Sequence, residues 1–287
     1  MSILSIKKTE NEEEKVWVGR QIGRSTFLRK LFHISSNYLI LRSWYIRKEI
    51  RKWAKKDHTD VNILDAGSGF GQCAYYLSSL NSKWNIFSLD INRDKVCQCN
   101  SFFNNIGRQN VVFRTGDIKD HISEKSYDLA LSIDVLNYIE DDDQVIRNIY
   151  SSLKPNGTFL LSVPTCHSEF DIFPIQTEKQ ILNPVRRGYK KKELIKKVKD
   201  AGFEIEYIAF TYGKAGKWAY NIAIRWPLKA LQLAKFSVII LPFYWIFSLP
   251  VAIVLNIYDM FAKNRNGEGL IIRALKKQYN HRKLATL

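Results

Sequence analysis

A glycine-rich turn followed at a distance by an acid carries the clearest chemical signal in this chain. The turn lies in Ile63–Gly71, which reads Ile-Leu-Asp-Ala-Gly-Ser-Gly-Phe-Gly, and Asp90 ends the next apolar stretch. Glycine lets a backbone approach a ligand closely, and a helix that begins behind the turn favours a negative group. A carboxylate placed like Asp90 can accept hydrogen bonds from ribose hydroxyls. The pattern therefore predicts a nucleoside-containing ligand.

The glycine spacing argues against a dinucleotide as that ligand. The fingerprint of dinucleotide-binding proteins is G-x-G-x-x-G. Here the third glycine, Gly71, comes one residue early, and Gln72 stands at the fingerprint position. Together with the acid at Asp65, this spacing favours a nucleoside with an amino-acid tail over a pyrophosphate.

Four sequence blocks occur in a fixed order around this turn. They are Leu64–Gly71, Leu89–Ile91, Thr115–Ile118 and Tyr127–Leu136, and Leu153–Phe159 follows the last of them. Residues 61–165 resemble a class I S-adenosylmethionine-dependent methyltransferase of the broad group that includes quinone and small-molecule methyltransferases. The resemblance implies methyl transfer as the activity and S-adenosyl-L-methionine as the cofactor.

The resemblance also implies roles for the residues of the turn. Gly67 and Gly69 would shape the loop around the methionine part of the cofactor, and Ser68 and Gly71 belong to the same loop. Asp65 would help to anchor the amino end of the cofactor.

Further cofactor-binding roles are implied at the ends of the next strands. Asp90 would hold the ribose hydroxyls, with Ile91 packed on the adenine. Asp117 would accept a hydrogen bond from the adenine amino group, with Ile118 beside it, and Asp134 would lie near the methionine part. For Asp117, a turn-forming role ahead of a helix is the alternative.

Catalysis of methyl transfer to such a cofactor can rest largely on positioning and on exclusion of water. A general base is needed only when the acceptor must lose a proton. Many relatives carry a histidine shortly after the fourth strand, whereas this chain has Asn137 and Tyr138. The catalytic candidates are therefore Asn137, Tyr138 and His167. His167 is favoured as the base because it follows the fifth strand, although a surface loop position is an equally good interpretation. Further candidates for the pocket are Glu169, Arg187 and Tyr189.

These residues must be positioned by an alternation of strands and helices. Strands are expected at 61–66, 85–90, 111–115, 127–133, 158–163, 203–210 and 269–275, and the helices between them at 72–80, 93–106, 141–153 and 190–201. This order predicts an α/β fold: a Rossmann-like, seven-stranded, mostly parallel sheet with an antiparallel C-terminal strand. A hydrophobic helical insertion precedes the last strand.

Four segments are expected from this pattern. Residues 1–60 form a basic N-terminal tail and cap helices, 61–210 the cofactor-binding core, 211–266 the insertion, and 267–287 the last strand with a basic tail. The formal charge of +16 is uneven: residues 1–60 carry +7, 61–174 carry −5 and 175–287 carry +14. Basic flanks suggest a polyanionic partner, nucleic acid or anionic lipid, and a solvated lysine-rich surface is the alternative.

The four cysteines do not indicate a disulfide framework or a metal site. Cys97 and Cys99 are two residues apart in an expected helix, and no second Cys/His pair follows at zinc spacing. Residues 1–16 lack the apolar core of a secretory signal. We therefore expect free thiols, no metal and a cytoplasmic protein.

The insertion contains 22 residues without a charge, Phe236–Ile257. As a helix this stretch would span about 33 Å, enough to cross a bilayer, but Pro242 and Pro250 should kink or break it. A single crossing would also leave the last strand on the wrong side of the membrane. We therefore expect a monotopic hairpin of about 216–235 and 236–263 at the cytoplasmic face of an anionic membrane. The alternative is a hairpin packed on the protein's own core or in a dimer interface.

The hairpin would place aromatic residues at the headgroup level and cations near the phosphates. The aromatic residues are Trp218, Tyr220, Trp226, Tyr244 and Trp245. The cations are Lys214, Lys217, Arg225, Lys229, Lys235, Lys263 and Arg265.

The leading hypothesis is a methyltransferase for a lipophilic or membrane-resident small molecule such as a lipid, a quinone or a pigment. An RNA methyltransferase is the main alternative, because of the basic charge. Nucleic acid is the less favoured partner, since the strand-four block lacks the Asp/Asn-Pro-Pro-aromatic pattern of amino-methylating nucleic-acid enzymes. A non-catalytic protein that binds S-adenosylmethionine is the second alternative. The acceptor, the methylated atom and the oligomeric state are not predicted.

Overall fold

The computed structural model describes residues 25–55, 61–121, 123, 125–168, 184–233 and 237–277. The predicted N-terminal tail, most of the C-terminal tail, Glu169 and Lys235 lie outside these residues. The chain divides into two compact units. We call Ala54–Val163, Tyr189–Ile208 and Ile272–Leu287 the core unit, and Met1–Trp53, Pro164–Gly188 and Ala209–Ile271 the helical unit.

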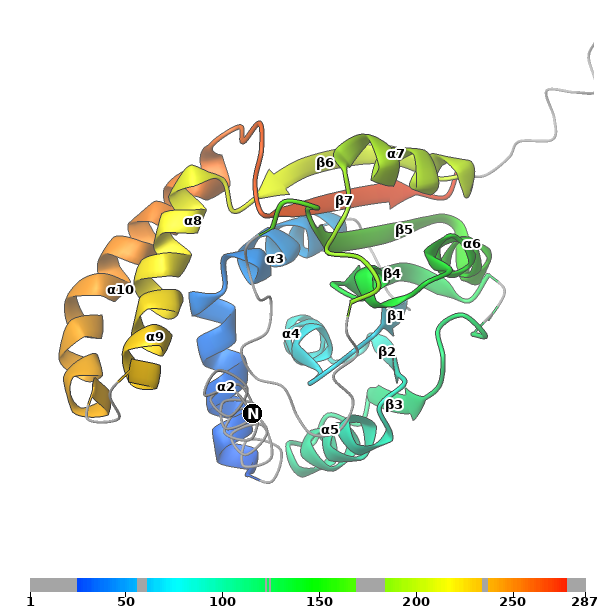
Figure 1. Ribbon diagram of the computed structural model, residues 1–287. Helices are drawn as coiled ribbons and strands as arrows, with labels where there is room; N and C mark the ends of the chain where they lie inside the picture. Colours follow the sequence, from blue (N-terminus) through cyan, green and yellow to red (C-terminus); the bar gives the residue numbers. More distant parts are fainter. Residues whose placement is uncertain are drawn as a thin grey trace, which may run out of the picture. The chain divides into compact units, whose positions relative to one another are not determined.

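Seven strands form one sheet in the order β3-β2-β1-β4-β5-β7-β6 (Figure 1). The strands are β1 Asn62–Ala66, β2 Asn85–Asp90, β3 Val111–Thr115, β4 Tyr127–Ile133, β5 Leu153–Pro164, β6 Glu204–Thr211 and β7 Gly269–Leu275. β1 to β5 pair in parallel, and β7 runs antiparallel to β6. The predicted α/β fold class, with its helical insertion before the last strand, is confirmed.

The central parallel strands β1 and β4 are largely buried on both faces, as their apolar sequences require. Ile63, Leu129 and Leu131 are almost completely buried. The register sets Asp65 opposite Ser88 of β2 and Leu131 of β4. The ends of β1, β2 and β4 therefore meet at one edge of the sheet, and the loops that follow these strands begin there.

Helices α4 Gln72–Leu80, α5 Arg93–Asn105, α6 Asp142–Ser152 and α7 Lys191–Asp200 join the strands. The side chain of Asn92 caps α5 by accepting a hydrogen bond from the Lys95 N–H, and Asp141 caps α6 in the same way. Such caps satisfy N–H groups that the first turn of a helix leaves without partners. The capping residues thus fix where the helices behind the strand ends begin.

β5 is longer than the sequence predicts. Leu153 was expected to end the preceding helix and Lys154–Gly157 to form a turn before the strand, but β5 already begins at Leu153. Asn156, at φ +62°, donates its N–H to Lys276 O, and Lys276 N–H donates to Gly157 O. The turn residues are therefore part of the sheet because the chain after β7 pairs with them.

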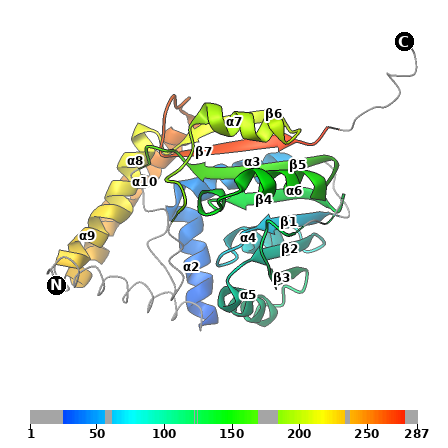
Figure 2. The same cartoon turned by 45° about the vertical axis from the view of Figure 1, so that its right-hand side comes forward.

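The helical unit contains α2 Thr26–Leu39, α3 Leu41–Ala54, α8 Lys214–Tyr220, α9 Trp226–Leu233 and α10 Ser237–Phe261. A π-helical segment, Asn221–Arg225, joins α8 to α9. The expected hairpin is present, with α10 alongside α8 and α9 (Figure 2). Pro242 and Pro250 were expected to kink or break this stretch; α10 continues through both, so the helix is not broken there.

A buried carboxylate ties three helices of this unit together. The Asp259 side chain, at the end of α10, accepts hydrogen bonds from Tyr45 Oη of α3 at 2.9 Å and from the Gly216 N–H of α8 at 3.0 Å. A Cβ atom at Gly216 would lie 2.5 Å from Leu41 Cδ2 and 3.0 Å from Asp259 Cγ. Only glycine allows the helices to approach this closely.

Candidate functional site

The glycine loop is hydrogen-bonded to the end of β2. The N–H groups of Gly67 and Ser68 donate to Leu89 O at 2.8 and 3.0 Å. The Gly69 N–H donates to Asp90 Oδ2 at 2.7 Å, and the Asn92 N–H donates to Asp90 Oδ1 at 2.9 Å. Asp90 therefore holds the loops after β1 and β2 in one arrangement.

The three glycines of the loop meet different constraints, although all have positive φ. A Cβ atom at Gly67 would lie 2.2 Å from Val135 Cγ2, and one at Gly71 would press on the rings of Phe113 and Phe103. A Cβ atom at Gly69 would meet nothing within 4 Å. Gly67 and Gly71 are thus required by packing as well as by backbone conformation, whereas the backbone at Gly69 faces open space where a ligand can approach.

Asp65 is a buried carboxylate with a strongly raised pKa. Its side chain is 2% exposed, and Oδ2 has no hydrogen-bond partner among the described residues. Burial, with a smaller contribution from the charge of Asp90, raises its pKa from 3.8 to about 7, and a hydrogen bond from the Ala74 backbone opposes this rise. A cation beside this carboxylate would supply the charge and the donor that it lacks.

The residues predicted to hold the adenosine part lie after β2 and β3. Ile91 is 55% exposed directly beside Asp90, which is unusual for a large apolar side chain next to a polar turn. Asp117 is half-buried, and its Oδ1 accepts from the Lys119 N–H at 2.9 Å, while Ile118 is buried. Asp117 thus forms a local turn, which is the alternative interpretation. This turn does not exclude a role of Asp117 in binding the cofactor.

The end of β4 carries the remaining predicted residues. Asp134 is buried at φ +56°, and its N–H donates to Ser162 O at 2.8 Å. A non-glycine residue in this conformation is uncommon and marks a tightly determined turn. Asn137 follows in the 3₁₀ turn Leu136–Tyr138; it is buried, and its Oδ1 has no partner within the described part of the chain. Tyr138 is half-buried.

The buried hydroxyl of Tyr189 holds the Leu136–Tyr138 turn in place and does not face a pocket. Its hydroxyl is fully buried, 3.0 Å from Leu136 O and 2.6 Å from Asp142 Oδ2. Lys197 of α7 donates to Asp142 Oδ1 at 2.9 Å. The expectation that Tyr189 could face the pocket is wrong, because its polar end is used to clamp the turn that carries Asn137 and Tyr138.

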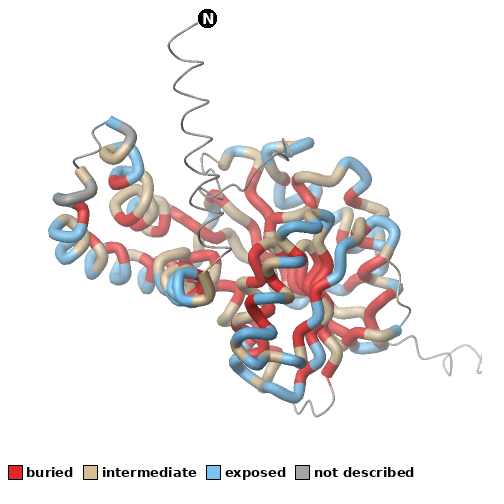
Figure 3. Tube along the Cα trace, turned by 90° about the horizontal axis from the view of Figure 1, so that it is seen from below, coloured by how far each residue is buried: buried red, intermediate tan, exposed pale blue. Residues whose placement is uncertain are grey.

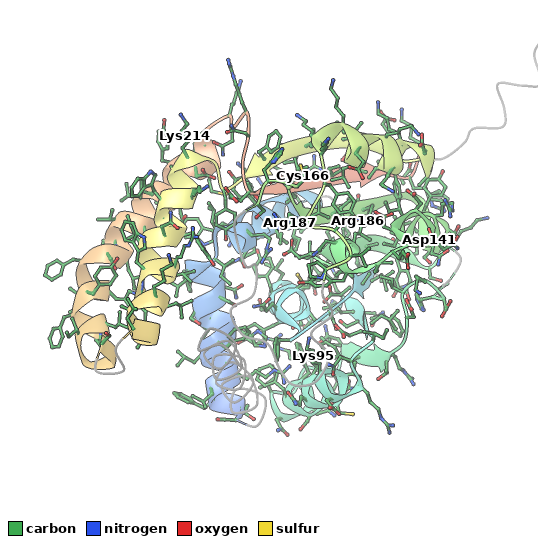
Figure 4. All side chains as sticks on the ribbon, viewed as in Figure 1. Lys95, Asp141, Cys166, Arg186, Arg187 and Lys214 are labelled. Carbon is green, nitrogen blue, oxygen red and sulfur yellow. The ribbon has the colours of Figure 1, made fainter. Side chains whose placement is uncertain are left out.

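His167 and Arg187 lie in the helical unit, on the segment between β5 and α7. His167 is exposed, and so is Arg187, which Figure 4 labels on this segment with Arg186 and Cys166. The role of His167 as a base stays a prediction. The surface loop interpretation agrees with its exposure.

Sequence reasoning missed two supports of the glycine loop. Lys95 Nζ lies 5.5 Å from the centre of the buried Phe70 ring, and the Cys99 thiol lies 3.5 Å from Gly69 O. Both residues come from α5. Their one-turn spacing, i and i+4, was the available signal, but without the fold it did not reveal that this face of α5 covers the loop. Within the described ranges, no group of three or more His, Cys, Asp or Glu residues could hold a metal ion.

The residues present fit S-adenosylmethionine. Asp65 offers a buried carboxylate oxygen without a partner to a cationic amino group, and Gly69 leaves room along the backbone. Asp90 and the exposed Ile91 offer an acceptor and an apolar surface to a nucleoside. The amino group and the nucleoside of the cofactor thus have chemically matching groups at the ends of β1 and β2.

Replacing Asp65 by Asn should stabilise the cofactor-free protein near pH 8. The folded pKa of about 7 lies above the unfolded value of 3.8, so between these pH values the folded state holds a proton that the unfolded chain has lost. This stabilisation is complete below about pH 4 and is lost as the pH rises through 7. In urea unfolding, the wild type should lose up to about 4 kcal/mol relative to Asp65→Asn between about pH 4 and pH 8. Asp200→Asn, at an exposed ion pair, is the control and should follow the wild type.

The same carboxylate should make cofactor affinity depend on pH. Because Asp65 must be ionised to bind an ammonium group, wild-type affinity for S-adenosylmethionine should rise up to about tenfold per pH unit until about pH 7. In Asp65→Asn, titration calorimetry should show weaker binding, and the affinity should no longer fall toward acidic pH. An affinity and a pH dependence that are both unchanged in the variant would contradict the assignment of Asp65.

The clamp on the β4 turn can be tested with Tyr189→Phe. Loss of the buried hydroxyl should lower the free energy of unfolding by about 1–3 kcal/mol, since Asp142 and Leu136 O lose a partner. Hydrogen exchange at the Tyr138 and Ile139 amides, which donate to Val135 O and Leu136 O, should accelerate. Tyr150→Phe keeps its ring against Phe203 and should leave these amides unchanged. Equal exchange in both variants would exclude the clamp.

Comparison with known proteins shows the family of this chain. A methyltransferase domain family matches residues 57–222. The chain is 24% identical over 183 residues to the ubiquinone biosynthesis O-methyltransferase of Rickettsia typhi, covering 64% of this chain and 69% of that protein. It is 31% identical over 109 residues to the arsenite methyltransferase of Aquipseudomonas alcaligenes, covering 35% of this chain and 32% of that protein. The chain thus spans about a third of that relative's length.

Among solved structures, the fold is similar to phosphoethanolamine N-methyltransferase 2 of Haemonchus contortus in complex with S-adenosyl-L-methionine. The TM-score is 0.56 at 17% identity, and the match covers 82% of this chain and 53% of that one. At this identity the likeness shows the fold alone. The family match covers more than half of the chain and coincides with the predicted cofactor blocks. The chain therefore belongs to the class I S-adenosylmethionine-dependent methyltransferases.

Proposed function

We propose that this protein methylates a lipophilic or membrane-resident small molecule, such as a lipid, a quinone or a pigment. The observation that carries the choice of acceptor is the apolar surface of α10, where Phe247 is 77% and Phe261 81% exposed. The similarity to ubiquinone biosynthesis O-methyltransferases adds support for an apolar acceptor. An enzyme that takes its substrate from a membrane has a use for such a surface, and one with a water-soluble substrate does not.

The residues of the core unit divide the work of this reaction. S-adenosylmethionine, when bound, supplies an activated methyl group. Asp65 would hold the amino end of the cofactor, Asp90 its ribose, and the Gly67–Gly71 backbone would follow its methionine part. Asn137 would accept a hydrogen bond from the acceptor through its buried Oδ1, since no described residue occupies that atom. Catalysis would then rest on positioning, and His167 or Tyr138 would be needed only for an acceptor that loses a proton.

We also propose that the protein acts at the cytoplasmic face of an anionic membrane as a monotopic or peripheral protein. α10 passes the length and composition test for a membrane span over Ile240–Phe261, and only 22% of that stretch is buried. The cations of the insertion lie near it in the sequence, and Lys214 extends from the start of α8 (Figure 4). Apolar residues combined with cations favour an interface that bears anionic headgroups.

Two other functions remain as alternatives. The formal charge of +16 favours an RNA methyltransferase, but the exposed apolar residues of α10 do not suit a phosphate backbone. A non-catalytic S-adenosylmethionine-binding protein is the second alternative, since a fold does not fix a function.

A label-partition assay tests the acceptor. The protein is incubated with methyl-labelled S-adenosylmethionine and a crude extract of membranes and cytosol, and organic-soluble material is separated from RNA and protein. We expect label in the organic phase, reduced at least a hundredfold in Asp90→Ala because the loss of one charged acceptor to the ribose costs about 3 kcal/mol. Asp200→Asn is the matched carboxylate control and should transfer label normally.

The other outcomes select the alternatives. Label in RNA that Asp90→Ala abolishes would establish the RNA methyltransferase and overturn the lipophilic acceptor. Binding of the cofactor in calorimetry without label in any fraction of extracts from several hosts would favour the non-catalytic protein.

A further inference from the structure

On α10 large apolar side chains are exposed and mostly small or polar ones are buried, which is the reverse of a surface helix on a water-soluble domain. Its buried residues recur every three, four or seven positions and so form one stripe, and most are small or polar: Leu241, Ser248, Ala252, Asn256 and Asp259. Its exposed residues are large and apolar: Ile240, Phe243, Ile246, Phe247, Val251, Ile253, Val254, Ile257, Tyr258 and Phe261. A surface helix in water has the opposite arrangement. Figure 3 shows the exposed residues along this arm of the molecule.

The buried stripe of α10 packs against small residues of α8 and of the π-helical segment, as helices in lipid do. Ala219 of α8 and Ala223 of the π-helical segment are buried in one cluster with Ala252 of α10. Gly216, one turn before Ala219, approaches Asp259 so closely that a Cβ atom would not fit. In hydrocarbon, where apolar side chains gain nothing by leaving the solvent, small residues and hydrogen bonds hold helices together.

Two backbone carbonyls of the π-helical segment accept side-chain hydrogen bonds inside the hairpin. Tyr244 Oη donates to Ile222 O at 2.8 Å, and Trp245 Nε1 donates to Ala223 O at 3.1 Å. Hydrocarbon requires such internal partners because no water is present to replace them. The two polar ends that were expected to reach headgroups are therefore used within the hairpin, whereas Trp218 and Trp226 stay exposed.

α2 has the same inversion. Phe27, Leu31, Ile34 and Tyr38 recur at intervals of four, three and four residues, and all four are exposed, with Phe27 at 73%. The opposite face buries Arg29, His33 and Ser36. Among the described residues of the helical unit, this apolar stripe is a second exposed surface, separated in sequence from α10 by about two hundred residues.

The positive charge of the chain favours lipid over a second copy of the protein as the partner of these apolar faces. Each copy carries a formal charge of +16, so two copies repel each other, whereas an anionic bilayer attracts each of them. Lys30 on α2, Lys214 and Lys229 on the first arm of the hairpin, and Lys263 and Arg265 after α10 are exposed. These cations stand beside the apolar faces, as they do in interfacial helices.

The topology determines how the hairpin can enter a bilayer. β6 precedes the hairpin, β7 follows it, and the two strands are neighbours in one sheet. The chain must therefore return to the side from which it left. A single crossing by α10 is excluded, although its length would allow one.

We propose that the exposed faces of α2 and α10 both insert into the hydrocarbon of an anionic membrane, with the hairpin entering and leaving on the same side. This inference deepens the membrane part of the proposed function and rests on it. It assigns α2, and not the hairpin alone, to the membrane, and it assigns the apolar side chains to the acyl-chain region and not to the headgroups. It makes no use of methyl transfer.

The first test measures binding of the full-length protein to vesicles of phosphatidylcholine with 30 mol% phosphatidylglycerol (about one anionic lipid in three) by flotation. Two variants replace three exposed residues each by serine: Phe27, Leu31 and Ile34 on α2, or Phe243, Phe247 and Val254 on α10. Each should weaken partitioning at least tenfold, because less apolar surface is buried. The control, Leu80→Ser with Val112→Ser, removes exposed apolar residues of the core unit and should bind as the wild type does.

The second test measures depth. An environment-sensitive fluorophore is attached at Leu31→Cys or Phe247→Cys after Cys73, Cys97 and Cys166 are replaced by Ser; Cys99 is fully buried. Lipids brominated on the acyl chains should quench both probes by at least half, and an aqueous quencher should not reach them. A probe at Leu80→Cys should show the reverse.

Several outcomes would overturn the inference. Full vesicle binding by the α2 variant, with an unquenched probe at position 31, would remove α2 from the membrane. Bound protein whose probes respond only to the aqueous quencher would place both faces at the headgroups. A wild-type dimer in light scattering that the α10 variant converts to a monomer, without vesicle binding by either, would assign the face to a second copy.

Cofactor binding separates these results from a failure of the enzyme assignment. All variants should bind S-adenosylmethionine as the wild type does, because the substituted residues lie outside the site. Normal cofactor binding with lost vesicle binding therefore reports on the membrane faces alone. Methylation of RNA by a protein that still inserts would refute the proposed acceptor and leave this inference standing.

Discussion

A carboxylate buried without a counter-charge is costly in free energy, and the site of this protein is arranged around one. Asp65 ends the apolar strand β1, is 2% exposed and lies near the charge of Asp90. The fold holds it there because the parallel pairing of β1 with β2 and β4 fixes the end of the strand. The ligand that relieves this cost is a cation, which is why an amino acid tail on a nucleoside fits the site better than a pyrophosphate.

The loops around Asp65 are held by two other side chains, and one of them, Asp90, is also predicted to hold the ribose of the cofactor. Asp90 fixes the glycine loop through the Gly69 N–H, and Tyr189 fixes the turn after β4 through Leu136 O. The second contact matters because this chain has Asn137 and Tyr138 where many relatives have a histidine. A neutral pair of side chains on a clamped turn suits a reaction driven by positioning, in which the protein needs no strong base of its own.

The helical unit follows a different rule of burial from the core unit. In the core unit, strands bury Ile, Leu and Phe as they do in any protein in water. In α2 and α10, polar and small residues are inside and large apolar residues are outside. The sheet is stabilised by the removal of apolar surface from water. The hairpin is held by close packing and hydrogen bonds, such as those of Asp259 and Tyr244, and the proposed insertion into lipid would account for this difference.

The sequence by itself determined the alternation of strands and helices, the glycine loop and the acids at the ends of β1 to β4, because local hydrophobic period and turn chemistry are written in adjacent residues. It also located the apolar insertion. It misplaced the start of β5, since the turn at Asn156 becomes part of the strand only when Lys276 pairs with it. It left open whether Pro242 and Pro250 kink or break the insertion, and α10 continues through both.

Only the tertiary structure decided which face of each helix is buried and which distant groups meet. The roles of Tyr189 and Cys99 depend on contacts with Leu136 and Gly69 that are 53 and 30 residues away in sequence. The inversion of α10 was hidden in the sequence because an almost wholly apolar stretch has no polar side to indicate its orientation. Its few small and polar residues acquire meaning only when Gly216, Ala219 and Ala223 are seen to face them.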